Sequence, residues 1–166
     1  MKLLACTLAV LFATSAHAFN VDGIRSGMSV QELSTHATRQ GWQLKSGDGL
    51  NYIMGKLDQQ QIDSSLTVCN GIVVNYYRSI DPDVDYTNVL SDMLDKYGQP
   101  TVVVRRLPVY QAPGQYIPEV FLKWYSQGDR ISLSTSPESR DGQGALRFKR
   151  GASIAYTVRS TCIKDF

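Results

Sequence analysis

The chain has 166 residues, a formal net charge of +2 and 19% charged residues. This length suits one domain that can bury a substantial apolar core. The near-balanced charge, without a polybasic run, excludes the usual electrostatic signature of nucleic-acid binding, so we expect no nucleic-acid partner.

The first eighteen residues have the three-part layout of a secretory signal peptide. Met1-Lys2 is a short positive start, Leu3 to Ala13 is an apolar run, and Ala16-His17-Ala18 forms an A-x-A cleavage site. The apolar run is shorter than the roughly 18 residues of a membrane-spanning helix. We expect cleavage after Ala18, which would leave residues 19–166 as a single exported domain, periplasmic or secreted, without a stable membrane anchor.

Lipidation of Cys6 is an alternative to cleavage after Ala18. Leu3-Leu4-Ala5-Cys6 resembles a lipoprotein processing box. However, the long apolar part follows this cysteine instead of preceding it, and this order favours a cleaved signal peptide.

Cleavage would leave two cysteines, Cys69 and Cys162. An even pair in an exported protein usually forms a disulfide, which would stabilise the fold by about 4 kcal/mol in the chain-entropy model. The alternative is a catalytic thiol activated by a base, and His36 is the one histidine in the mature chain. We expect the disulfide.

A first helix is predicted after Met28. Ser29 and Glu32 have the S-x-x-E spacing of a capping box, and Met28 and Leu33 stand at the positions of a hydrophobic staple. Gly41 is suited to ending the helix.

A second helix is predicted from about Tyr86 to Tyr97, where apolar residues recur at helical spacing. Gly98 and Pro100 would end it. We expect Asp83 or Asp85 to cap its start.

The acidic segment Asp81 to Asp85 also resembles the start of a calcium-binding loop. Tyr86 stands where that loop needs glycine, and Asp92 stands where it needs glutamate. We therefore interpret the segment as a linker and expect no bound metal.

Apolar alternation and turn residues predict an antiparallel meander, with Asn70-Gly71 as its strongest hairpin signal. The predicted strands are 42–45, 50–54, 65–69, 72–77, 101–107, 119–126, 130–135, 145–149 and 153–159. The first four of these strands follow the first predicted helix, and the other five follow the second. The pattern therefore divides into two possible repeats, at about 19–80 and 81–166. The fold class that we expect is α+β, with two tandem helix-plus-antiparallel-strand units whose helices pack on one face of the meander sheet.

One stretch resembles a known family. The segment Gly23 to Leu33, GIRSGMSVQEL, resembles the opening of the SmpA/OmlA (BamE-like) small envelope proteins, and Tyr97-Gly98-Gln99-Pro100 is similar to their helix-ending G-x-P. The tandem arrangement also resembles the two-unit beta-lactamase inhibitory protein fold. The resemblance implies an interaction module, not an enzyme.

No catalytic motif is present: the sequence lacks a nucleophile elbow, an H-E-x-x-H zinc motif and a P-loop. We expect no catalytic residue and no cofactor, and we expect His36 to be a partly exposed surface residue. The leading hypothesis is a periplasmic module that binds an envelope or secreted protein, in a narrower form an inhibitor or immunity protein. The alternative is a small periplasmic hydrolase or ligand-binding protein with a carboxylate-lined cleft.

The segment Leu107 to Pro118 is the candidate partner-binding element. Its three prolines make it a poor central strand, and Tyr110 and Tyr116 would be presented near Arg105 and Arg106, residue types that often anchor interfaces. The alternative, which we weigh slightly higher, is that the rings fold back as a lid over the sheet.

Overall fold

The computed structural model describes residues 19–47, 51–56, 61–108, 114, 116–126, 128–140 and 142–163. The helices within these ranges are α1 (Val30–Arg39) and α2 (Tyr86–Tyr97). The strands are β1 (Asn20–Val21), β2 (Ile24–Arg25), β3 (Gln43–Ser46), β4 (Asn51–Lys56), β5 (Gln61–Cys69), β6 (Ile72–Ile80), β7 (Thr101–Pro108), β8 (Tyr116–Ser126), β9 (Asp129–Ser136), β10 (Ser139–Arg140), β11 (Leu146–Phe148) and β12 (Gly151–Val158).

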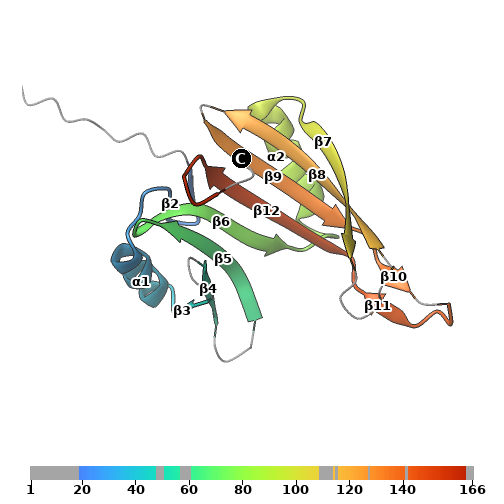
Figure 1. The fold of residues 1–166 in the computed structure, drawn as a ribbon, viewed down its shortest axis with the longest axis horizontal. Coiled ribbons are helices and arrows are strands. Elements are labelled where there is room, and N and C mark those ends of the chain that lie inside the picture. Colours follow the sequence, from blue (N-terminus) through green and yellow to red (C-terminus); the bar gives the residue numbers. More distant parts are fainter. Residues whose placement is uncertain are drawn as a thin grey trace, which may run out of the picture.

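Eight strands form one continuous antiparallel sheet in the order β3-β4-β5-β6-β12-β9-β8-β7 (Figure 1). The centre of this sheet is the long pairing between β6 and β12, which joins strands from opposite halves of the chain. Two short ribbons, β1–β2 and β10–β11, stand outside it.

The predicted fold class is wrong. In the described part of the chain the protein is mostly β, with one eight-stranded antiparallel sheet, and it is not built as helices packed on a sheet in two units. The two halves on either side of residue 80 do not have separate cores, because β6 and β12 pair along their length. The predicted strand 145–149 is also not part of the large sheet, since β11 pairs with β10 in a separate ribbon.

The hydrophobic core follows one row of cross-strand partners over the middle of the sheet. In this row Leu66 pairs with Tyr76, Tyr76 with Tyr156, Tyr156 with Ile131, and Ile131 with Trp124. All five side chains are buried. Because directly paired residues point to the same face of a sheet, this row identifies the core face for both halves of the chain.

Helix α1 begins as its sequence predicts. The Ser29 hydroxyl accepts a 3.2 Å hydrogen bond from the Glu32 N–H, and the Ser29 N–H donates one of 2.8 Å to the Glu32 carboxylate. This hydrogen bond from the Ser29 N–H is the main cause that lowers the pKa of Glu32. The staple residues Met28 and Leu33 are buried, so the local signal and the tertiary packing agree.

The ends of helix α2 are confirmed, but the expected cap is not. Asp85 stands at the N-cap position and makes no side-chain capping bond. Instead, the Asp81 carboxylate accepts hydrogen bonds of 2.8 Å and 3.0 Å from the N–H groups of Asp83 and Val84. The acidic segment thus folds as a turn closed by its first aspartate.

The predicted hairpin at Asn70-Gly71 is confirmed. Both residues have positive φ, 52° and 81°, which is the backbone that this kind of two-residue turn requires. The turn connects β5 to β6.

Cys69 and Cys162 lie at disulfide distance, with Sγ atoms 1.96 Å apart and Cα atoms 5.8 Å apart. The geometry is compatible with the predicted bridge. It ties the segment after β12 to the end of β5, across 93 residues of sequence.

Candidate functional site: the uncovered face of the sheet

Neither described helix covers the face of the sheet opposite the core. The apolar side chains of α1 and α2 pack into the core cluster on the other face, and Figure 1 shows α2 behind β8 and β9. The cross-strand register assigns to this uncovered face a set rich in small polar and aromatic residues: Ser65, Thr67, Asn75, Tyr77, Ser79, Val103, Arg105, Glu119, Phe121, Lys123, Tyr125, Arg130, Ser132, Ser134, Ser153, Ala155 and Thr157.

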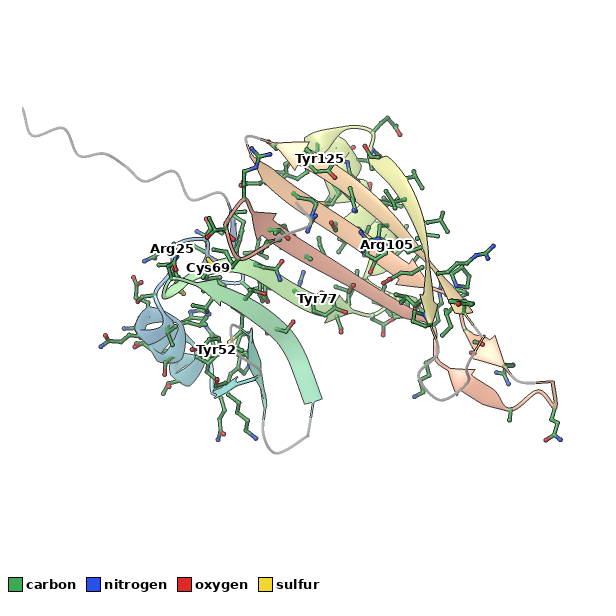
Figure 2. The ribbon with its side chains drawn as sticks, in the orientation of Figure 1. Arg25, Tyr52, Cys69, Tyr77, Arg105 and Tyr125 are labelled. Atoms are coloured by element: carbon green, nitrogen blue, oxygen red, sulfur yellow. A yellow bond between two sulfur atoms is a disulfide. The ribbon has the colours of Figure 1, made fainter. Side chains whose placement is uncertain are left out.

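Neighbouring aromatic residues on β6 and on β8 point to opposite faces of the sheet. Tyr76 and Trp124 are buried in the core, whereas their neighbours Tyr77 and Tyr125 are 38% and 57% exposed. Figure 2 shows Tyr77, Tyr125 and Arg105 at separate places on the sheet. Aromatic side chains therefore reach solvent from a face that is otherwise dominated by hydroxyl groups.

The centre of the uncovered face is held together by hydrogen bonds between small side chains. The Oγ atoms of Ser134 and Ser153 lie 2.6 Å apart, and the Thr157 hydroxyl donates a 2.8 Å hydrogen bond to Oδ1 of Asn75. Ser134, Ser153 and Thr157 are buried. Because these groups satisfy one another, the centre of the face is well ordered and offers few polar groups for chemistry.

Two cations converge on one aromatic ring where this face meets the β7 edge. Cζ of Arg105 lies 5.1 Å from the ring centroid of Phe121, and Nζ of Lys123 lies 5.8 Å from it. Arg105 comes from β7, and Phe121 and Lys123 come from β8 at alternate positions. Both contacts are within the range of cation–π attraction, so this cluster presents an apolar ring with positive charge on its flanks.

The structure separates the residues that the sequence suggested as one site. In the β7–β8 register Arg105 lies opposite Glu119 on the uncovered face, whereas Arg106 lies opposite Pro118 and Tyr116 opposite Pro108 on the other face. Tyr116 is 58% exposed, so the preferred prediction that its ring folds back as a lid is wrong. Tyr110 lies outside the described residues.

Sequence reasoning missed Phe121 and Lys123. The signal that could have identified them is the alternation along β8. If Trp124 faces the core, then 121, 123 and 125 face the other way. Their approach to Arg105 depends on the β7–β8 register, and no local pattern in the sequence predicts this register.

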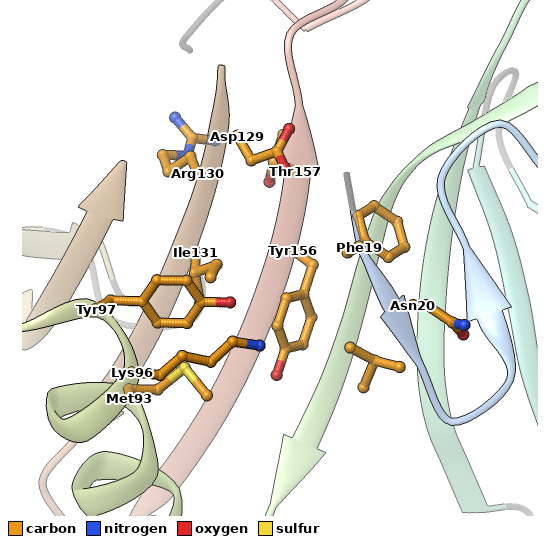
Figure 3. Close-up of a pocket in the computed structure, with 11 residues that line it drawn as sticks. Phe19, Asn20, Met93, Lys96, Tyr97, Asp129, Arg130, Ile131, Tyr156 and Thr157 are labelled. Atoms are coloured by element: carbon orange, nitrogen blue, oxygen red, sulfur yellow. The ribbon is translucent and has the colours of Figure 1, made fainter. Parts of the chain in front are cut away.

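A separate cleft of about 310 Å³ lies on the core side, between the N-terminal segment and α2 (Figure 3). Its lining residues are Phe19, Asn20, Val21, Met93, Lys96, Tyr97, Asp129, Arg130, Ile131, Tyr156 and Thr157. Burial raises the pKa of Tyr156 to about 12 and also raises the pKa of Asp129. Asp129 is the one carboxylate among the described residues of this lining, so this cleft does not match the carboxylate-lined cleft of the alternative hypothesis.

His36 is half-buried, which agrees with the expectation of a partly exposed residue. Its ring makes an edge contact with Trp42, with centroids 6.3 Å apart, and its Nε2 atom has no hydrogen-bond partner within the described part of the chain. Gly23 lies directly against the ring, and a Cβ atom there would come within 2.5 Å of Cε1 of His36. The histidine is thus packed between a turn and an aromatic residue, and no described acidic side chain hydrogen-bonds its Nε2 atom to orient it as a base.

Within the described ranges, no three His, Cys, Asp or Glu side chains gather closely enough to hold a metal ion. Neither α1 nor α2 has the length and hydropathy that a membrane crossing requires. The chain matches no protein-family model, and comparison with curated proteins and with solved structures gives no significant match.

Proposed function

We propose that the mature chain is a non-enzymatic periplasmic module that binds an envelope or secreted protein through the uncovered face of its sheet. The observation that carries this proposal is the cluster of Arg105 and Lys123 around Phe121. Rings and arginines of this kind are frequent anchors of protein interfaces. An inhibitor or immunity protein directed at a secreted hydrolase is a narrower form of the same proposal.

The charges near the cluster favour an acidic surface on the partner. The register places Arg105 and Lys123 on this face, with Glu119 opposite Arg105. An acidic partner would complement this positive excess and would be steered toward it at low ionic strength.

Export supports the same proposal. The cysteine pair at disulfide distance suits an oxidising compartment, and the predicted signal peptide would deliver the chain there. The resemblance of Gly23 to Leu33 to SmpA/OmlA proteins also suggests the cell envelope.

The matched variants Arg105→Glu and Arg106→Glu test the proposal. Both replace an exposed arginine on β7, but the two side chains lie on opposite faces of the strand. With immobilised mature protein and envelope extract, we expect Arg105→Glu to weaken capture of the bound protein by about 30-fold or more, as loss of an interface anchor does. Arg106→Glu should capture it like the wild type.

Two further measurements sharpen the result. Capture by the wild type should fall as salt is raised, because the attraction is electrostatic. Equal loss in both arginine variants would indicate a general charge effect, and unchanged capture in Arg105→Glu would overturn the proposed site. The melting temperatures of both variants should stay near that of the wild type.

A further inference from the structure

The two edges of the eight-stranded sheet differ sharply. At one edge β3 has four residues, carries Lys45 and lies against α1. Short, charged or covered edge strands are the usual protection against pairing with another chain. At the other edge β7 has eight residues, and no described strand pairs with its outer side. The β7 strand is therefore not short, and its first half, Thr101 to Val104, carries no charged residue.

The first half of β7 is exposed and mostly apolar. It contains the run Val102-Val103-Val104, in which Val102 is 61% exposed and Val104 is 64% exposed. Valine has high strand propensity and packs well against valine across a strand pair. Every second residue of an edge strand also directs its N–H and C=O away from the sheet, where they can pair with a further strand.

We propose that β7 pairs antiparallel with β7 of a second copy of this chain, which would join two sheets into one across a two-fold axis. This inference goes beyond the proposed function, because it uses the edge of the sheet and not its uncovered face. A two-fold contact requires a strand that is complementary to itself, and β7 meets that requirement in one register.

In that register the two-fold axis passes beside Val103. Val103 lies opposite Val103 of the second copy and Val102 lies opposite Val104, so the valines pair with valines on both faces. Arg105 lies opposite Thr101, an uncharged residue. The two Arg105 residues are then four positions apart along the strands, about 13 Å, which exceeds the screening length of about 8 Å at physiological salt. Registers centred on Arg105 or Arg106 would place like charges directly opposite each other, which is destabilising.

The second copy is favoured over an unrelated strand by this self-complementarity. The valine run supplies the same apolar surface to both strands, and the arginines at positions 105 and 106 fall outside it in both copies. The pairing would also cover Val102 and Val104, the two most exposed apolar side chains of β7.

The oligomeric state of the oxidised mature protein tests the proposal. By sedimentation velocity over about 1 to 200 µM, we expect the wild type to approach twice the monomer mass. The double variant Val102→Lys/Val104→Lys should raise the dissociation constant of the dimer about tenfold or more, because charge on an edge strand blocks pairing. Val84→Lys is the matched control, since Val84 is 67% exposed but lies in the turn before α2, and it should remain dimeric.

Crosslinking tests the register. Val103→Cys should form a disulfide between two copies under mild oxidation, because the two positions face each other across the axis. Arg105→Cys should not, since its partner in the second copy lies too far along the strand. A wild type that stays monomeric throughout the range, a lysine variant that dimerises like the wild type, or crosslinking at 105 and not at 103 would overturn the proposal.

Discussion

The hydroxyl of Tyr76 donates a 2.9 Å hydrogen bond to Oδ2 of Asp22, so a central strand of the sheet holds the turn of the N-terminal hairpin. Arg78 contacts the same oxygen at 3.4 Å. Burial, followed by the charge of Asp22, raises the pKa of Tyr76 well above its usual range, and burial raises the pKa of Tyr156 on the neighbouring strand to about 12. The stability of the middle of the core face thus depends on Tyr76 and Tyr156 remaining protonated and uncharged.

Stability should therefore fall at alkaline pH. A phenol whose folded pKa is raised stabilises the fold fully below its unfolded pKa of about 10, and this contribution is lost as the pH rises toward the folded value. Denaturant unfolding from about pH 8 to pH 11.5 should show this decline, and Tyr156→Phe should make it shallower because one of the two phenols is gone. Tyr125→Phe is the control, since that ring is 57% exposed. The same slope in all three proteins would contradict the assignment.

The contact between Gly23 and His36 predicts an unusually costly glycine substitution. Gly23 has φ +77°, and an added Cβ would approach Cε1 of His36 to 2.5 Å, whereas Gly27 has φ +80° and open space around it. Gly23→Ala should therefore cost about 2 to 4 kcal/mol in unfolding free energy, from backbone strain and overpacking together. Gly27→Ala should cost about 1 to 2 kcal/mol from backbone strain alone.

A double-mutant cycle separates the two causes. In a His36→Ala background the ring is absent, so Gly23→Ala should cost about as much as Gly27→Ala does. The measurement is urea denaturation of the four proteins. If Gly23→Ala costs the same with and without the imidazole, the packing explanation fails.

The pairing of Cys69 with Cys162 predicts a large effect of reduction. A bridge across 93 residues should contribute about 4 kcal/mol in the chain-entropy model. Reduction of the wild type should lower the melting temperature while circular dichroism at room temperature remains nearly unchanged. Mass spectrometry of the protein isolated without reductant should find the two cysteines linked, and two free thiols there would refute the bridge.

Tyr116 and Trp124 on the same strand should respond in opposite ways to truncation. Tyr116 is 58% exposed, so Tyr116→Ala should leave the melting temperature nearly unchanged. Trp124 is buried and its Nε1 donates a 2.7 Å hydrogen bond to the Gly98 carbonyl, so Trp124→Ala should cost about 3 to 5 kcal/mol. Thermal unfolding of both variants tests this. A large loss in Tyr116→Ala would restore the lid interpretation.

The sequence alone was sufficient where neighbouring residues control the backbone. The capping box of Ser29 and Glu32, the positive φ values of Asn70 and Gly71, and the ends of α2 at Tyr86 and Tyr97 all agree with prediction. In each case the physical cause, a hydrogen bond or a steric preference, acts within a few residues. The pairing of Cys69 and Cys162 was predictable for a different reason, because the predicted cleavage after Ala18 would leave no other cysteine.

Only the tertiary structure decided that the strands form one sheet, and which residues share its uncovered face. The pairing of β6 with β12 and of β7 with β8 depends on contacts between segments far apart or joined by a loop, and no local pattern encodes their register. A shift of one residue in the β7–β8 pairing would exchange the faces of Arg105 and Arg106. The candidate site is therefore a consequence of register. Burial of the core row from Leu66 to Trp124 decides which residues of β8 face away from the core, and the pairing of β7 with β8 then brings Arg105 to the same face as Phe121.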